Sequence, residues 1–247
     1  MKKIFLLAAV FVSLVFDACK KQTENFTSAP VESYAPLVVG KYITYKLDSF
    51  KYKPFSLKDT TTSYQVKHVV DGLINDNLGR PAYRIIRYRR KTAQQAWVPD
   101  NSFMAVNTGS AYEFIENNYR FLKLKSPIKE GFSWKGNSYI DTYSLNSLVR
   151  YLDDWDYSYE KVDQPLALGA FKLDSTVTVN QRDEVIGNPA DANSYSEKNF
   201  GSEVYAKGIG MVYRRFLHTE FQPATPGSVS SFSDGSYGVT LTMIDHN

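Results

Sequence analysis

Hydrophobic and polar residues alternate with a period of two along much of the chain. In residues 41–49, Ile43, Tyr45 and Leu47 fall on one face. The longest alternating run, residues 171–181, places these apolar side chains on one face: Phe171, Leu173, Val177 and Val179. A period of two is typical of a β-strand with one buried and one solvated face. The pattern therefore predicts an all-β chain.

Turn residues separate the alternating segments, which predicts short connections and antiparallel neighbours. We expect strands at residues 41–49, 64–70, 82–90, 102–106, 111–115, 119–125, 171–181 and 237–245, and two more within 203–221. Adjacent Ile85 and Ile86 break the alternation and indicate a β-bulge. Residues 144–152 are compatible with one short helix. The prediction is a single antiparallel β domain, as a curled sheet, an open barrel or a sandwich, with at most one or two short helices.

The first 19 residues have the order of a bacterial export signal. Lys2 and Lys3 precede an apolar run over residues 4–16, which is too short to span a bilayer as a permanent helix. The run leads to Ala18-Cys19, which resembles a lipobox, although Asp17 is unusual there. We predict a signal peptide over residues 1–18 and lipidation of Cys19; the alternative is an ordinary signal sequence without lipid.

The segment after Cys19 is polar and without periodicity, so we expect a flexible tether over residues 19–33 and the β domain over 34–247. Cys19 is the single cysteine of the chain, so the domain has no disulfide to stabilise it. The formal net charge is +3 and no long Lys/Arg run occurs, which argues against a nucleic-acid partner.

Catalytic and cofactor signatures are not found in the sequence. No G-x-S-x-G elbow or phosphate-binding glycine loop occurs, and the three histidines have no partner at metal-ligand spacing. We therefore predict no catalytic residue, no metal and no cofactor. His218 and Glu220 lie two apart on one strand face and are candidates to meet a ligand together, whereas a half-buried structural histidine is the simpler interpretation. The acidic run at residues 153–156 has no calcium-loop spacing and reads as a solvated loop.

Aromatic residues are the other candidate binding feature. Trp134, Trp155 and Tyr157 are candidates for a stacking platform for a sugar or an apolar ligand. The alternative is that they fill the core of the β domain.

Five segments resemble a group of lipoproteins from Bacteroidetes-type cell envelopes. The resemblance lies in the opening Y-x-P-L-x-V-G-x-Y-x-x-Y of residues 34–45, and in residues 79–85, 131–137, 205–213 and 241–245. Ile43 stands where such openings often carry Trp. The resemblance implies an exported β lipoprotein without catalytic residues. At the level of fold the chain also looks like the curled-sheet carriers that shelter an acyl chain.

These features together predict a membrane-anchored, non-catalytic envelope protein that binds an apolar or glycan ligand or a partner protein. The alternative is a structural or assembly subunit of an outer-membrane complex, and an enzyme comes third. We expect attachment to the outer membrane, with the periplasmic face favoured by Lys20 and Lys21, because surface-exported lipoproteins of this group are acidic after the cysteine.

Overall fold

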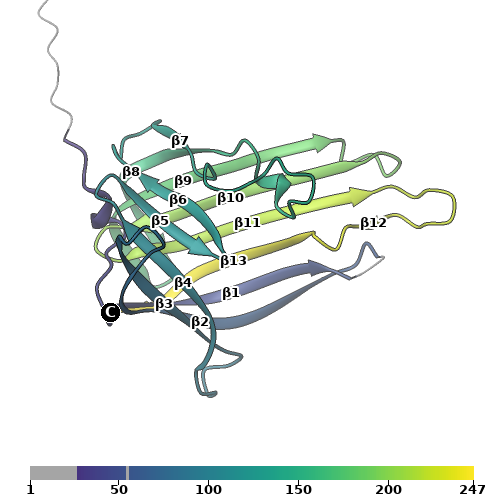
Figure 1. The fold of residues 1–247 in the computed structure, drawn as a ribbon. Helices are drawn as coiled ribbons and strands as arrows, with labels where there is room; N and C mark the ends of the chain where they lie inside the picture. Colours follow the sequence, from purple (N-terminus) through teal and green to yellow (C-terminus); the bar gives the residue numbers. More distant parts are fainter. Residues whose placement is uncertain (1–26, 54–55) are drawn as a thin grey trace, which may run out of the picture.

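The computed structural model describes residues 27–53 and 56–247, which fold into one antiparallel sheet (Figure 1). The strands are β1 (Tyr42–Tyr52), β2 (Asp59–Asn75), β3 (Pro81–Arg90), β4 (Val98–Asn107), β5 (Ala111–Glu116), β6 (Tyr119–Lys125), β7 (Ser133–Lys135), β8 (Asp156–Leu168), β9 (Phe171–Gly187), β10 (Ser196–Ala206), β11 (Gly210–Gln222), β12 (Ser231–Phe232) and β13 (Tyr237–His246). Two short 3₁₀ turns accompany them, η2 (Val31–Ser33) and η3 (Arg150–Leu152).

The sheet consists of two meanders joined in its middle. Its strand order is β6-β5-β4-β3-β2-β1-β13-β11-β10-β9-β8-β7, with β12 paired to β11. The two ends of this order meet: the Leu122 N–H donates to the Gly136 carbonyl at 2.8 Å, and Trp134 Nε1 donates to the Leu122 carbonyl at 2.7 Å. A side chain at Gly136 would collide with the ring of Tyr157, so glycine permits this close seam. The result is a nearly closed barrel.

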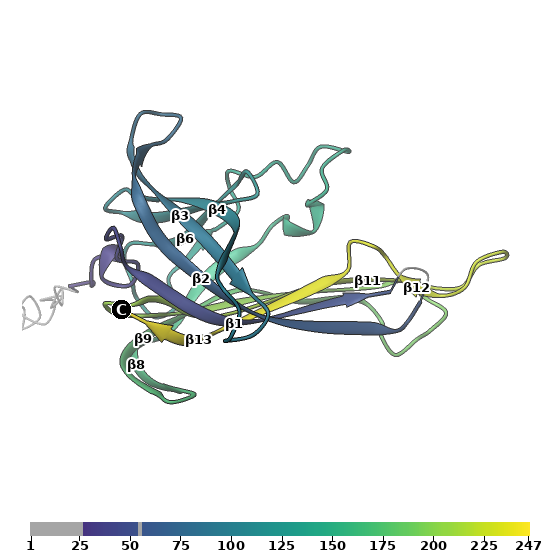
Figure 2. The ribbon, with the colours of Figure 1, turned by 90° about the horizontal axis from the view of Figure 1, so that it is seen from below.

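The barrel encloses only one end of the sheet. Strands β3 to β6 lie over one half of the long sheet, whereas β1, β11 and their neighbours continue beyond them (Figure 2). The inner face is therefore covered at one end and open at the other. Loop residues 137–149 lie above this inner face between the two regions.

The N-terminal segment closes the covered end. Val31 and Tyr34 are fully buried, and the Tyr34 hydroxyl donates to Asp163 Oδ1 at 2.5 Å. Ser28 is already held, because its Oγ accepts the backbone N–H of Ile128 at 2.7 Å. Packing thus begins before Tyr34, and the described part of the expected tether is docked on the domain. The expected signal peptide and Cys19 lie outside the described residues.

The apolar side chains form two cores, a larger one inside the barrel and a smaller one whose members come from both faces of the sheet. The expected core face of β9 is divided between them: Val177 and Val179 pack in the larger core inside the barrel, and Leu173 packs in the smaller one. The β8–β9 hairpin curls to the other side of the sheet, which explains the division (Figure 2). Thr176, expected on the wet face, is buried and donates from its hydroxyl to the Gln164 carbonyl.

The all-β expectation and the expected strands are confirmed, with three local corrections. The bulge expected at Ile85 and Ile86 lies instead in the partner strand, at Asp71. The expected helix over 144–152 is a loop ending in η3. Strands β7, β8 and β12 were not expected. No helix in the described ranges has the length and apolar character needed to cross a membrane.

Candidate ligand-binding cavity

Strand register arranges the inner face of the sheet in rows of different chemistry. From the covered end toward the open end, the inward residues of β10, β11 and β13 form the rows Glu203–Arg214–Leu241, Gly201–Phe216–Val239 and Asn199–His218–Tyr237. A charged row, an apolar row and a polar row therefore follow one another along the same surface.

The first two rows border a cavity inside the barrel, the inner cavity. Its volume is about 500 Å³, within the range of small-molecule pockets. Its walls are mostly aromatic and aliphatic and include Ile43, Leu47, Phe103, Phe114, Phe216 and Val239. These side chains come from five strands of both meanders, because alternation turns one side chain in two toward the interior.

Two ion pairs cross the interior and join the meanders. Lys123 Nζ on β6 lies 2.6 Å from Glu203 Oε1 on β10, and Arg214 Nη1 on β11 lies 2.9 Å from Glu116 Oε2 on β5. Arg214 also lies beside Glu203, with Nε 3.6 Å from Oε1. The Tyr205 hydroxyl donates to the second oxygen of Glu203 at 2.7 Å. We call Glu116, Lys123, Glu203 and Arg214 the crossing network.

Both carboxylates of the crossing network are held ionised. Burial acts to raise the pKa of Glu203, but the charges of Lys123 and Arg214 outweigh it and lower that pKa. Burial likewise acts to raise the pKa of Glu116, and Arg214 overcomes it to give about 2. General acid–base catalysis works best with a pKa near the ambient pH. These carboxylates therefore suit electrostatic and structural roles better than proton transfer.

Several buried polar atoms of the cavity wall have no hydrogen-bond partner within the described residues: Gln181 Nε2, His68 Nε2 and Arg214 Nε. Gln181 is only 3% exposed and is the bulged residue of β9, between the pairings of Asn180 and Arg182 with β10. Opposite it, a Cβ at Gly201 would lie 2.7 Å from Gln181 Oε1 and 2.8 Å from Trp155, so only glycine leaves room for both side chains.

His68 is held among aromatic rings. Its ring centroid lies 5.1 Å from that of Tyr45 and 5.2 Å from that of Phe103. Burial lowers the pKa of His68 to about 3, and the charge of Arg87 acts in the same direction. The imidazole is therefore neutral at physiological pH.

The third row borders a second hollow at the open end, the outer cleft, with a volume of about 1090 Å³. Its lining is polar and includes Arg182, Glu184, Glu197, Asn199, His218 and Glu220. His218 Nδ1 lies 2.8 Å from Asn199 Oδ1, and Asn199 Nδ2 donates to Glu197 at 2.6 Å. The Tyr151 ring stacks on His218 with centroids 3.9 Å apart.

The inner cavity and the outer cleft adjoin. Tyr151 and Tyr237 line both, and their hydroxyl oxygens lie 3.2 Å apart. The exposed Leu148 from the loop above also lines both. A molecule entering the barrel from the open end would pass this pair of tyrosines.

The structure distributes the expected site residues over three environments. Trp155 and Tyr157 line the inner cavity, whereas His218 and Glu220 line the outer cleft. Trp134 packs at the seam against Tyr159, with centroids 4.5 Å apart. All three aromatic candidates are buried, so they do not form an exposed stacking platform. Sequence reasoning missed the crossing network and Gln181.

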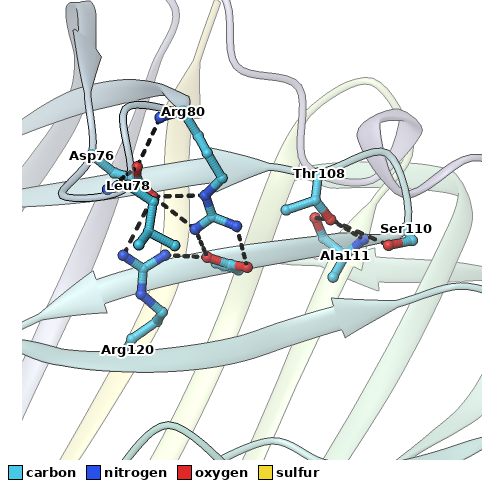
Figure 3. Close-up of polar contacts among 8 residues, drawn as sticks. Asp76, Leu78, Arg80, Thr108, Ser110, Ala111 and Arg120 are labelled. Carbon is cyan, nitrogen blue, oxygen red and sulfur yellow. Dashed lines mark hydrogen bonds and ion pairs between the residues drawn. The ribbon is translucent and has the colours of Figure 1, made fainter.

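A second cluster of charged groups lies outside both hollows (Figure 3). Arg80 contacts Asp76 and Glu113, the carboxylate drawn without a label, and Arg120 contacts the same two carboxylates. Burial acts to raise the pKa of Asp76, but hydrogen bonds from Arg80 and from the Leu78 N–H hold it at about 2. The two positive and two negative charges compensate each other, so the cluster acts as a clamp between the β2–β3 turn and strands β5 and β6.

A metal site has no support in residues 27–53 and 56–247, where no group of three or more His, Cys, Asp or Glu side chains is arranged to hold an ion. Comparison of the chain with models of protein families, with curated proteins and with solved structures found no match.

Proposed function

We propose that this protein is a non-catalytic, lipid-anchored envelope protein whose barrel binds an apolar or amphipathic small molecule. The observation that carries the proposal is the inner cavity of about 500 Å³, lined mainly by aromatic and aliphatic side chains. A cavity of this size without a ligand forfeits packing contacts along its walls, whereas an apolar guest restores them.

The crossing network is compatible with this role. Its charges are paired with one another. Both carboxylates have a lowered pKa, whereas general acid–base catalysis near neutral pH works best with a pKa close to 7. The network instead joins β5 and β6 to β10 and β11 across the interior, which fixes the spacing of the two meanders around the cavity.

Binding is tested by displacement of an apolar fluorophore whose emission rises in a dry environment. Val239→Phe adds a ring inside the cavity, and we expect it to weaken binding about tenfold, since overpacking costs about 1–3 kcal/mol. Thr240→Phe is the matched control, because it adds the same ring to the other face of β13. Equal binding by both variants and the wild type would contradict the proposal.

The cellular location of the protein is part of the same proposal. The basic and apolar order ending at Cys19 supports a diacylated or triacylated N-terminus, and more than one acyl chain gives stable membrane residence. Lys20 and Lys21 support the periplasmic face of the outer membrane. Digestion of the protein by protease added to intact cells would contradict that orientation.

Contact with a partner protein is the second candidate function. Tyr143 and Leu145, on the loop above the inner face, are 79% and 87% exposed. Exposed apolar groups of this kind are typical of contact sites when they are contiguous. Crosslinking in cells through a photoreactive residue at position 145, compared with one at the exposed Lys172, tests this candidate.

A further inference from the structure

The wall of the inner cavity has more hydrogen-bond donors than acceptors. A guanidinium carries five N–H groups, an ammonium three and a carboxamide two. Gln181 Nε2 and Arg214 Nε have no hydrogen-bond partner in the described part of the chain. The neighbouring acceptors are engaged: Glu203 accepts from Lys123 and Tyr205, and Glu116 accepts from Arg214.

Gln181 is the decisive residue of this wall. It is 97% buried, since only 3% of its surface is exposed, and it lines the cavity. A buried donor without a partner is unfavourable by about 1–3 kcal/mol. Alternation places Gln181 on the same face of β9 as Val177 and Val179, inside the barrel, where Gly201 leaves room for its side chain. An acceptor oxygen on a guest molecule would supply the missing partner.

The buried charges of the wall are already balanced, and Lys41, which lines the cavity at an exposed position, donates to the Asn247 carbonyl at 3.1 Å. Lys123 and Arg214 face Glu116 and Glu203, and Arg87, which also lines the cavity, is paired with Asp100 at 2.8 Å. An ionised guest would add one uncompensated charge to a buried site, which is strongly unfavourable. The acceptor that fits is therefore an uncharged one.

We infer that the inner cavity takes an uncharged carbonyl compound with a hydrocarbon chain, such as an ester, an amide or a ketone, with its carbonyl oxygen directed toward Gln181 and Arg214. This inference rests on the proposed function and names the chemical class of the ligand. The hydrocarbon chain lies against the aromatic and aliphatic wall. The polar end thus lies deep in the barrel rather than in the outer cleft.

The experiment compares four guests with one chain length in the fluorophore displacement assay: the methyl ester, the carboxylate, the alcohol and the plain hydrocarbon. We expect the ester to bind about tenfold tighter than the hydrocarbon, because it satisfies a buried donor. We expect the ionised carboxylate to bind more weakly than the ester. A carboxylate that binds tightest, or an ester no better than the hydrocarbon, would overturn the inference.

Gln181→Leu removes the donor while keeping a side chain of similar size. We expect the advantage of the ester over the hydrocarbon to fall to less than about threefold, with hydrocarbon affinity unchanged or higher. Gln164→Leu, at an exposed position of β8, is the matched control and should keep the full advantage. An undiminished ester advantage in Gln181→Leu would overturn the inference. If none of the guests displaces the fluorophore, it is the proposed function that fails.

Discussion

Removing one partner of the Lys123–Glu203 pair should destabilise the fold strongly. The two side chains are 5% and 0% exposed, and Lys123 Nζ lies 2.6 Å from Glu203 Oε1. Breaking a buried ion pair from one side costs about 3–5 kcal/mol, because the remaining charge stays buried without its counter-charge. Glu203→Gln preserves shape and still accepts the Tyr205 hydroxyl, so this substitution isolates the charge. We expect it to lower the free energy of unfolding by about 3–5 kcal/mol.

The partner substitution should cost less. Lys123→Met leaves Glu203 with two remaining contacts, from Tyr205 at 2.7 Å and from Arg214 at 3.6 Å. The Lys123 ammonium, by contrast, donates its hydrogen bond to Glu203, so Glu203→Gln takes away the carboxylate that faces it. We expect the order of destabilisation Glu203→Gln above Lys123→Met. The destabilisation of the double variant should be smaller than the sum of the two single effects by at least about 1 kcal/mol, because neither charge is then left buried without its counter-charge.

Urea unfolding followed by tryptophan emission measures these free energies. The exposed pair Lys135–Asp154 serves as control, since Lys135→Met should change stability by less than about 1 kcal/mol. If Glu203→Gln does not fold alone, folding of the double variant carries the same information. Additive single effects, or a Glu203→Gln variant within about 1 kcal/mol of the wild type, would refute the reasoning.

Three further predictions address the core, the pH dependence and the anchor. Val177→Ala should cost about 2 kcal/mol from lost burial and the cavity left behind, whereas Thr178→Ala should cost well under 1 kcal/mol; denaturation that ranks them in the opposite order would contradict the strand register. Burial lowers the pKa of His68 to about 3, so this imidazole stays neutral in the folded protein at pH 5. In the unfolded chain His68 has its ordinary pKa of 6.5 and binds a proton below that pH. The free energy of unfolding should therefore fall by about 2 kcal/mol between pH 6.5 and 5. His68→Phe should flatten that part of the pH profile, and an unchanged slope would count against a buried neutral imidazole. Cys19→Ala should move the protein out of the detergent phase on partitioning, and unchanged partitioning would refute lipid attachment.

The period-two pattern predicts most of the strands because it is a local property. The faces of β1 and β13 follow from alternation in their own residues, and short turns such as residues 107–110 identify the hairpins. Strand β8 was not predicted, because Lys161 and Asp163 adopt positive φ values and Pro165 interrupts the alternation. Its pairing with β9 comes from tertiary packing.

The expected helix at residues 144–152 fails for a related reason. Its apolar residues suggest a short amphipathic turn, but Leu145 and Leu148 are 87% and 88% exposed and find no core to cover. Helical stability in proteins comes mainly from packing of an apolar face. Without that packing, only the 3₁₀ turn Arg150–Leu152 forms.

Of the candidate site, the sequence predicted only the aromatic residues, His218 and Glu220. A signal for the rest was present in the sequence: Lys123 follows Phe121 by two residues, and Glu116 follows Phe114 in the same way, so a charge occupies a core-facing position. Which charges meet depends on closure of the barrel, because the partners are separated by 80 and 98 residues. One strand pattern contains no information about such a contact across the interior.

Quenching of Trp155 by a guest with bromine on its hydrocarbon chain tests the central claim most directly. Of the three tryptophans, all of which the structure describes, Trp155 alone lines the inner cavity. We expect saturable quenching by the brominated ester, no quenching by the same ester without bromine, and no quenching of the emission that remains in Trp155→Phe. Wild-type emission that does not respond to the brominated ester, or equal quenching in Trp155→Phe, would contradict binding inside the barrel.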